Sequence, residues 1–256
     1  MSAPYEHSPA LAAIATVRHG FFGRAGGGST GAYASNNMST STGDTADHVA
    51  ANRAGAAAAL GFDPASLCLL RQVHSAAVVT VDAVPADGSV IEADAMVTRR
   101  PALALGIMTA DCTPILLADP QAGVIGAAHA GWRGAVDGIM ANTVTAMVEL
   151  GADPGRIIAA IGPTISGPNY EVGDGFRADF LALHPTGGHY FTTPPGKQVH
   201  FDLPAFVIEQ LAATGIGQIE RIGGCTYAEP TRYFSHRYAT HQGTTTGRQI
   251  AIIGLS

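Results

Sequence analysis

Three residues with metal-binding side chains each follow an apolar run of the sequence. His74 follows the run 67–73, Cys112 the run 102–110, and His129 the run 123–128. Imidazole nitrogens and a cysteine thiolate are preferred zinc ligands, and a site with three protein ligands keeps a fourth position for water or substrate. If the ends of these runs meet, the three residues form an open zinc site of the catalytic type.

The segment between Cys112 and His129 favours a β-hairpin. Residues 119–123, Asp-Pro-Gln-Ala-Gly, have turn chemistry and separate the strand-like runs 114–118 and 124–128. A turn centred between Pro120 and Gln121 places Cys112 opposite His129, and cross-strand Cβ atoms about 5 Å apart allow both side chains to reach one metal ion. Pro114 disturbs a regular strand just after Cys112. Spacing alone does not bring His74 to the pair.

Each of the three residues, taken singly, also has a structural explanation, as a hydrogen-bonded histidine or a buried inert thiol. The surroundings of His129 favour a function, because residues 128–134 read Ala-His-Ala-Gly-Trp-Arg-Gly. Small residues let the backbone approach a ligand, while Trp132 and Arg133 offer stacking and anion contacts. A core tryptophan followed by a surface arginine is the alternative interpretation.

Composition restricts the function further. The 256 residues are 46% hydrophobic and 13% charged, with a formal net charge of −6, and we expect a single domain over residues 1–256. The absence of a basic run argues against nucleic acid as a partner and favours a small molecule. No stretch reaches the roughly 20 apolar residues of a membrane span, and residues 1–20 lack signal-peptide features. We expect a cytoplasmic protein, for which a monomer is plausible.

The elements that must position these residues alternate along the chain. Helices are predicted over 43–60 with Asp44 as a cap, over 135–150, and over 203–214 with Asp202 as N-cap. Strands are predicted over 76–81, 102–108, 114–118, 123–128, 156–161 and 249–255. The widely separated Cys68, Cys112 and Cys225 fit reduced thiols. His184, His189 and His200 lie in a segment rich in proline and glycine, where we expect them to face solvent.

Residues 26–31 satisfy the pattern GxGxxG formally. They follow no buried strand and open no long helix, so a dinucleotide fingerprint is not supported. We interpret this segment instead as a flexible wall of the active site, with Arg24 and Asn37 at its edges; a glycine-rich surface turn is the alternative.

Several strings of the sequence resemble the YfiH/laccase-domain family, whose members are also described as purine nucleoside phosphorylases. They are GFFGR at 20–24, RQVH at 71–74, TADCTPILL at 109–117 and AHAGWRG at 128–134, followed by IGP at 161–163, YEVG at 170–173, CT at 225–226, FSHR at 234–237 and TGR at 246–248. The resemblance covers nearly the whole chain. It implies an α+β fold, a mixed two-sheet β-sandwich flanked by helices.

The resemblance also implies that His74, Cys112 and His129 together bind zinc, with copper as another possible metal. Asn37 aligns with a substrate-binding asparagine of the family, although Asn36 replaces the leucine that relatives usually carry before it. The implied activities are phosphorolysis of adenosine, inosine and S-methyl-5′-thioadenosine, and deamination of adenosine. Phosphorolysis needs cations for phosphate, for which Arg24 and Arg133 are candidates. Asp111 could orient a histidine ligand or move a proton, or it could be a turn or capping residue.

Other functions use the same residues. Cys112, His129 and Asp111 have the types of a cysteine hydrolase, and relatives have been suspected of editing peptidoglycan precursors. The laccase name implies copper-dependent polyphenol oxidation, but no HxH pair occurs among the 10 histidines. HxE, PCxxC and HExxH are absent, so the better-known zinc deaminase and peptidase patterns do not apply. A purely structural zinc is also conceivable, but it normally has four protein ligands.

Overall fold

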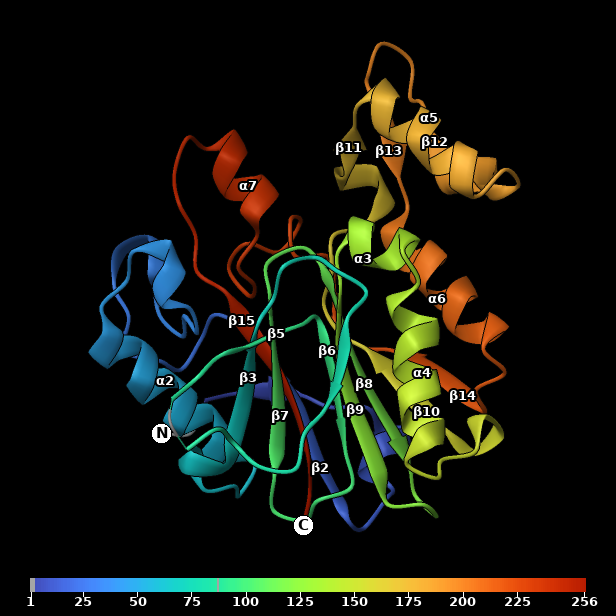
Figure 1. The fold of residues 1–256 in the computed structure, drawn as a ribbon. Helices are drawn as coiled ribbons and strands as arrows, with labels where there is room; N and C mark the ends of the chain where they lie inside the picture. The colour runs from blue at the N-terminus through green and yellow to red at the C-terminus, as the bar shows by residue number, and fades with distance from the viewer. Residues whose placement is uncertain (1–2, 87) are drawn as a thin grey trace.

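The computed structural model describes residues 3–86 and 88–256, and two mixed six-stranded sheets packed face to face form its centre (Figure 1). The first sheet has the order β1 (Tyr5–Glu6), β2 (Val17–Phe22), β15 (Gln249–Leu255), β7 (Ala104–Thr109), β3 (Leu67–Arg71) and β5 (Ile91–Glu92). The second has the order β14 (Gln218–Arg221), β10 (Ile158–Ile161), β8 (Thr113–Asp119), β9 (Val124–Ala130), β6 (Ala95–Thr98) and β4 (Val78–Thr80).

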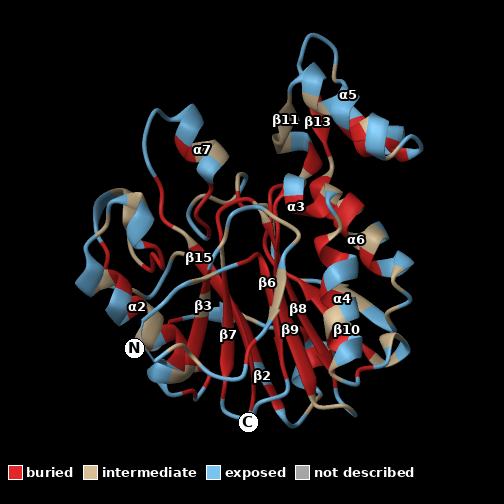
Figure 2. Ribbon diagram, in the orientation of Figure 1, coloured by how far each residue is buried: buried red, intermediate tan, exposed pale blue. Residues whose placement is uncertain are grey.

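Helices cover the outer face of each sheet. Helix α2 (Ala46–Ala59) packs on the first sheet, and α4 (Ile139–Glu149) and α6 (Leu203–Ala213) pack on the second. Strands β8, β9 and β15 are buried at every residue, as the red central strands of Figure 2 show. Because both faces of these strands are covered, they are continuous apolar runs in the sequence instead of alternating ones.

The space between the sheets is filled by side chains from both of them. Ile107 and Ile253 of the first sheet meet Leu116 and Ala127 of the second in one buried cluster. The predicted α+β fold with two mixed sheets and flanking helices is therefore confirmed. No helix in the described part of the chain is long and apolar enough to cross a membrane.

A third, small sheet stands apart from the other two. It contains β11 (Glu171–Val172), β13 (Val199–Phe201) and β12 (Phe191–Thr192), and it lies beside α5 (Asp174–Leu183). The expectation that three histidines of this region face solvent is wrong for two of them. His200 is only 7% exposed on β13, and His184 is half-buried with its ring stacked on Phe180, while His189 is exposed. The aromatic side chains that pack here come from α5 and from segments distant from it in sequence, such as β12 and β13.

The remaining short elements are three helices and six 3₁₀ turns within the described residues. The helices are α1 (Pro9–Ala12), α3 (Trp132–Val136) and α7 (His236–His241). The turns are Gly31–Tyr33, Thr40–Thr42, Pro64–Ser66, Pro154–Arg156, Gly167–Asn169 and Gly187–Tyr190. Of these elements, α3, α7 and the turn at residues 40–42 lie near the predicted site.

The predicted helices are confirmed in one case and corrected in two. Asp202 caps α6 as expected, with its side chain accepting a hydrogen bond from the Ala205 N–H. Helix α2 begins at Ala46, and Thr45 takes the N-cap position predicted for Asp44. The predicted helix 135–150 is interrupted, because Gly138 has a φ of +94° that an α-helix cannot accommodate. The interruption separates α3 from α4.

The hairpin of β8 and β9 forms, but its register differs from the predicted one. Asp119 pairs with Val124 and Pro114 pairs with His129, so Cys112 does not lie opposite His129. The Asp119 carboxylate accepts hydrogen bonds from the Gln121 and Ala122 N–H groups, which moves the turn one residue towards the C-terminus. This moves the pairing by two residues, which leaves every side chain on the same face. The side chains of Cys112 and His129 therefore still meet, diagonally.

Candidate metal centre and cavity

The three predicted ligands come together at one edge of the sandwich. His74 lies on the connection from β3 of the first sheet to β4 of the second, and Cys112 on the connection from β7 to β8. His129 is the penultimate residue of β9. Their donor atoms all lie within 4.8 Å of one another. Two sheet-to-sheet crossings thus deliver His74 and Cys112 to the end of the strand that carries His129.

Asp94 is the residue that builds this corner, and sequence reasoning missed it. Its fully buried carboxylate accepts hydrogen bonds from the N–H groups of Val73, His74 and Ser75, at 3.2, 3.0 and 2.6 Å. These bonds hold the turn in which His74 has a φ of +63°, a region that side chains other than glycine rarely adopt. The available signal was an acidic residue directly before a buried strand.

The same carboxylate orients a second ligand. Asp94 Oδ1 lies 2.8 Å from His129 Nδ1, and both side chains are almost completely buried. A His129 that donates from Nδ1 presents its Nε2 lone pair to a metal ion, which is the usual carboxylate–histidine–metal arrangement. Asp94 therefore determines both the turn that carries His74 and the orientation of His129.

Two glycines of the Ala-Gly-Trp-Arg-Gly segment are required by close packing at this corner. A Cβ atom at Gly131 would lie 2.7 Å from His74 Cδ2 and 3.2 Å from Cys112 Sγ. A Cβ atom at Gly134 would lie 2.5 Å from the Ser75 carbonyl oxygen. The small residues near His129 thus let the backbone come close to His74, to Cys112 and to the turn that carries His74.

The electrostatics of the group favour a thiolate. Burial alone would raise the pKa of Cys112, but the neighbouring His129 and His74 lower it to about 6. Burial would lower the pKa of His129, whereas Cys112 and Asp94 raise it to about 9. Although burial opposes it, His129 and Ser75 hold the pKa of Asp94 well below its usual range. The metal-binding form of Cys112 is therefore stabilised by its neighbours.

The carboxylate of Asp111 does not contact a histidine ligand, as a residue that orients a ligand would. Its carboxylate accepts hydrogen bonds from Thr226 Oγ1 and from the Arg237 N–H, each at 2.7 Å. The residue is buried, with a φ of +94°. These contacts fit the alternative of a turn and capping residue that ties α7 and Thr226 to the segment before Cys112.

A cavity of about 810 Å³ opens at the metal-binding corner. All three predicted ligands line it, together with apolar side chains such as Leu69 and Met108. Its volume lies in the usual range for small-molecule sites. Residues 26–31 are not among the described residues that line it, so this cavity gives no support to their interpretation as an active-site wall.

The two arginines predicted to bind phosphate do not line this cavity. Arg24 donates to the carbonyl oxygens of Ala34 and Pro230, and its guanidinium lies 4.8 Å from the ring centre of Phe234. Arg133 is exposed on α3, with its guanidinium 5.1 Å from the ring centre of Trp132. The lining contains three other arginines, Arg53, Arg71 and Arg248.

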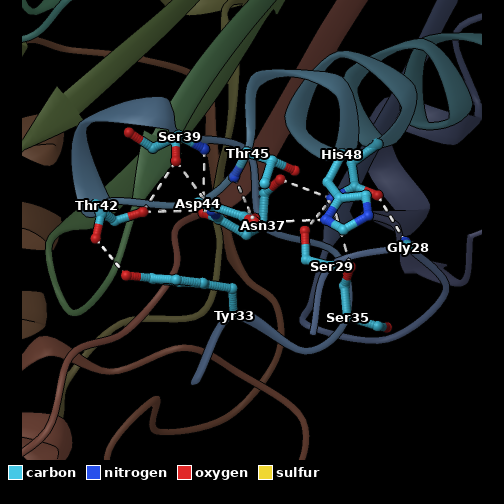
Figure 3. Close-up of polar contacts among 11 residues, drawn as sticks. Gly28, Ser29, Tyr33, Ser35, Asn37, Ser39, Thr42, Asp44, Thr45 and His48 are labelled. Atoms are coloured by element: carbon cyan, nitrogen blue, oxygen red, sulfur yellow. Dashed lines mark hydrogen bonds and ion pairs between the residues drawn. The ribbon is translucent and has the colours of Figure 1, made fainter. Parts of the chain in front are cut away.

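Asn37 is a buried centre of hydrogen bonding (Figure 3). Its amide nitrogen donates to Asp44 Oδ2 and to the Ser39 carbonyl oxygen, each at 2.9 Å. Its amide oxygen accepts from the N–H groups of Ser39 and Arg248, at 3.1 and 2.8 Å. Asn37 is absent from the cavity lining, whereas Ser39 and Arg248 belong to it. Its side chain thus supports the cavity wall from behind.

Fold and site together define an α+β protein with two packed sheets and a His-Cys-His candidate metal centre in an open cavity. Residues 18–256 match the family described as multi-copper polyphenol oxidoreductase laccase, and the chain belongs to that family.

Relatives with high sequence identity carry an enzyme name. The chain is 44% identical to a purine nucleoside phosphorylase of Deinococcus radiodurans, over 98% of this chain and 93% of that one. It is 42% identical to a purine nucleoside phosphorylase of Corynebacterium glutamicum, over 93% and 94% of the two chains. These names support an enzyme of small-molecule metabolism.

Two solved structures have the same fold. YlmD of Geobacillus stearothermophilus is 30% identical with a TM-score of 0.86, and the match covers 98% of each chain. YfiH of Bacillus licheniformis is 32% identical with a TM-score of 0.85, covering 94% of this chain and 93% of that one. The predicted resemblance to the YfiH/laccase-domain family is confirmed.

Proposed function

We propose that this chain is a zinc-dependent purine nucleoside phosphorylase that acts on adenosine, inosine and S-methyl-5′-thioadenosine. The observation that carries the proposal is the His74–Cys112–His129 group in the wall of a cavity large enough for a nucleoside. The names of relatives at 42–44% identity support the same reaction.

The donor set fits zinc in a catalytic type of site. Two imidazoles and one thiolate are zinc ligands, and no fourth histidine, cysteine or acidic residue joins the group within residues 3–86 and 88–256. Bound there, zinc would supply a Lewis acid with an open coordination position. The family description mentions several coppers, but the described residues offer one three-ligand group, so we rank copper oxidation below zinc chemistry.

In phosphorolysis, a phosphate oxygen forms a bond to ribose C1′ while the bond from C1′ to purine N9 breaks. The electron pair leaves with the base, which also takes up a proton. Leu69 and Met108 provide apolar surface for the nucleoside. His236 is the lining imidazole outside the metal group in the described residues, and it is our candidate for delivering that proton.

Adenosine deamination is a second activity that the three-ligand group favours. In this reaction water attacks C6 of adenine, and ammonia leaves after taking up a proton. The same cavity would hold the substrate, with the base instead of the ribose facing the ligands. Phosphate has no part in this reaction, which makes the two activities separable.

One observation favours the cysteine hydrolase as the alternative. Cys112, His129 and Asp94 have the order of a nucleophile, a base and a residue that orients the base, with Asp94 in the place expected for Asp111. Such an enzyme could edit peptidoglycan precursors. His74 has no role in that arrangement, although its Nε2 lies 3.9 Å from Cys112 Sγ. The second imidazole is why we prefer the metal site.

Product analysis of the zinc-loaded protein tests the proposal. We expect adenosine and inosine to yield free base and ribose 1-phosphate only when phosphate is present, and adenosine to yield inosine and ammonia without it. Protein purified without added metal should contain about one zinc per chain. A metal-free protein that hydrolyses its substrate and is inactivated by thiol alkylation would support the hydrolase instead. Zinc-loaded protein that forms none of these products refutes the nucleoside proposal.

A further inference from the structure

Two arginines in the cavity wall have no carboxylate ion-pair partner in the described part of the chain. Arg53 of α2 and Arg248, directly before β15, both line the cavity and are half-buried. Neither forms an ion pair with a carboxylate of the described residues, whereas Arg71 in the same lining pairs with Glu92. Proteins normally pair a cation that is withdrawn from water, because its desolvation is otherwise uncompensated.

Both arginines are held against the same residue, Met38. Arg53 Nε donates to the Met38 carbonyl oxygen at 2.8 Å, and the Met38 N–H donates to the Arg248 carbonyl oxygen at 2.9 Å. The Arg53 guanidinium also contacts Met108 Sδ, at 3.9 Å. Met38 thus joins the Arg53 side chain to the backbone of Arg248, and both residues line the same cavity.

Arg248 also lies near the metal-binding corner. Gln249 pairs with Thr109 at the end of β7, so Arg248 stands beside the segment that leads to Cys112. Burial lowers the pKa of Arg248, while Cys112 and Asp111 are close enough to raise it. Asn37 fixes the backbone of Arg248 through the network that Figure 3 shows in part.

A phosphate group matches this arrangement. A guanidinium presents planar donors that pair with phosphate oxygens, and a doubly charged oxyanion would compensate both half-buried cations at once. Within residues 3–86 and 88–256, the one hydrogen bond of the Arg248 guanidinium runs from Nη1 to the Gly247 carbonyl oxygen, at 3.0 Å. Its other donors are the groups we assign to the anion.

We propose that Arg53 and Arg248 form the site for inorganic phosphate, next to the His74–Cys112–His129 group. This inference rests on the proposed phosphorylase function, because it assigns the co-substrate site of that reaction. It replaces Arg24 and Arg133 as the phosphate-binding cations. The same chemistry could serve a phosphate carried by a nucleotide, so the source of the phosphate must be tested.

Calorimetric titration of the zinc-loaded protein with inorganic phosphate tests the site without turnover. We expect Arg53→Gln and Arg248→Gln each to weaken phosphate binding about tenfold or more, because each removes a charge-assisted contact. Arg248→Lys retains the positive charge and should weaken phosphate binding less than Arg248→Gln does. The matched control is Arg71→Gln, which removes an exposed, already paired arginine of the same cavity and should change binding less than about twofold.

Thermal unfolding of each variant checks that the fold is retained, and the KM for phosphate provides a second readout. We expect this KM to rise with little change in the KM for inosine. A parallel titration with adenosine 5′-monophosphate identifies the source: if the monophosphate binds through both arginines and inorganic phosphate does not bind, the co-substrate site is refuted. Parent-like phosphate binding by both glutamine variants also overturns it.

The two proposals can fail separately. If phosphate binding depends on Arg53 and Arg248 but no nucleoside is cleaved, the anion site stands and the phosphorylase function falls. If nucleosides are cleaved by phosphate and the glutamine variants keep the parent's phosphate affinity and KM, the function stands and the anion site is wrong.

Discussion

The two ends of the β8–β9 hairpin contain similar groups in different arrangements. At the turn, the buried Asp119 carboxylate accepts hydrogen bonds from Arg156 and from the N–H groups of Gln121, Ala122 and Asp153. At the open end, the buried Asp94 carboxylate accepts hydrogen bonds from three N–H groups, the Ser75 hydroxyl and His129. Each end is built around one buried carboxylate.

The two carboxylates differ in whether the groups they bind keep atoms that can bind a metal ion. Asp119 accepts hydrogen bonds from the hairpin turn and from Asp153 and Arg156, and the Arg156 side chain extends to the surface. Asp94 holds the backbone N–H of His74 and the imidazole of His129, and the two imidazoles converge with the Cys112 thiol on a cavity. A buried carboxylate therefore stabilises the fold at one end and, at the other, prepares ligands. Substitutions at the two ends should separate stability from metal binding.

Replacing Cys112 should have the largest effect. Cys112→Ala removes the only thiolate of the group, so we expect loss of stoichiometric zinc and a decrease in phosphorolysis of about a thousandfold or more, since the metal supplies several kcal/mol of stabilisation. Metal analysis and product formation measure the two effects. The control is Cys225→Ala, because Cys225 lies outside the ligand group. A Cys112→Ala variant that keeps zinc and activity would remove the proposed site.

Replacing Asp94 should reduce zinc affinity about 10- to 100-fold, as is usual for a residue that orients a histidine ligand. Asp94→Asn retains the shape but loses the charge that faces His129. Competition with a chelator measures the affinity independently of activity. Asp111→Asn is the matched comparison, because Asp111 bonds to Thr226 and Arg237 and should affect zinc less. Equal losses in the two variants would mean that Asp94 has no special role.

These two aspartates show how far the site could be predicted from sequence. His74, Cys112 and His129 were recognisable because each follows an apolar run and belongs to a family string. Asp111 attracted attention because it is adjacent to Cys112 in the sequence, yet its carboxylate contacts another part of the chain. Asp94 is distant in sequence from all three ligands, and its role depends on the pairing of β6 with β9. The residue that orients a ligand is therefore set by strand pairing, and not by its closeness to a ligand in the sequence.

The fold was predictable to a similar extent. Long buried strands such as β8 and β15 appeared in the sequence at nearly their observed bounds, because continuous burial produces continuous apolar runs. The strands of the third sheet could not be predicted from the sequence. They have only two or three residues each and are stabilised by aromatic contacts around α5. The hairpin register depended on the side chain of Asp119, which no hydrophobic pattern records.

Replacing Asp119 should affect stability alone. Asp119→Asn should cost about 2 kcal/mol of unfolding free energy at neutral pH, because it weakens buried charged hydrogen bonds. Burial alone would raise the pKa of Asp119, but Arg156 and backbone amides lower it from 3.8 to about 2. Because the folded pKa is depressed, the contribution is present above about pH 4 and is lost as the pH falls through about 2.

Urea unfolding at several pH values measures this effect. The difference between parent and Asp119→Asn should shrink between pH 4 and pH 2. Asp82→Asn is the control, because the Asp82–Arg100 pair is more than half exposed and should contribute little. Zinc affinity of the folded Asp119→Asn protein should match that of the parent. A tenfold loss would show that the two ends of the hairpin are coupled.

The smallest effect is expected at Arg133, next to the open end of the hairpin. Its guanidinium is exposed and lies over Trp132, a contact worth about 0.5–1 kcal/mol at such a site. Arg133→Gln should therefore lower stability slightly and change the KM for phosphate less than about twofold, because Arg133 is absent from the cavity lining. Phosphate kinetics compared with those of Arg248→Gln decide between the two arginines. If Arg133→Gln has the larger effect, α3 must move towards the cavity when substrate binds, and the cation predicted from the Ala-Gly-Trp-Arg-Gly segment is the phosphate ligand after all.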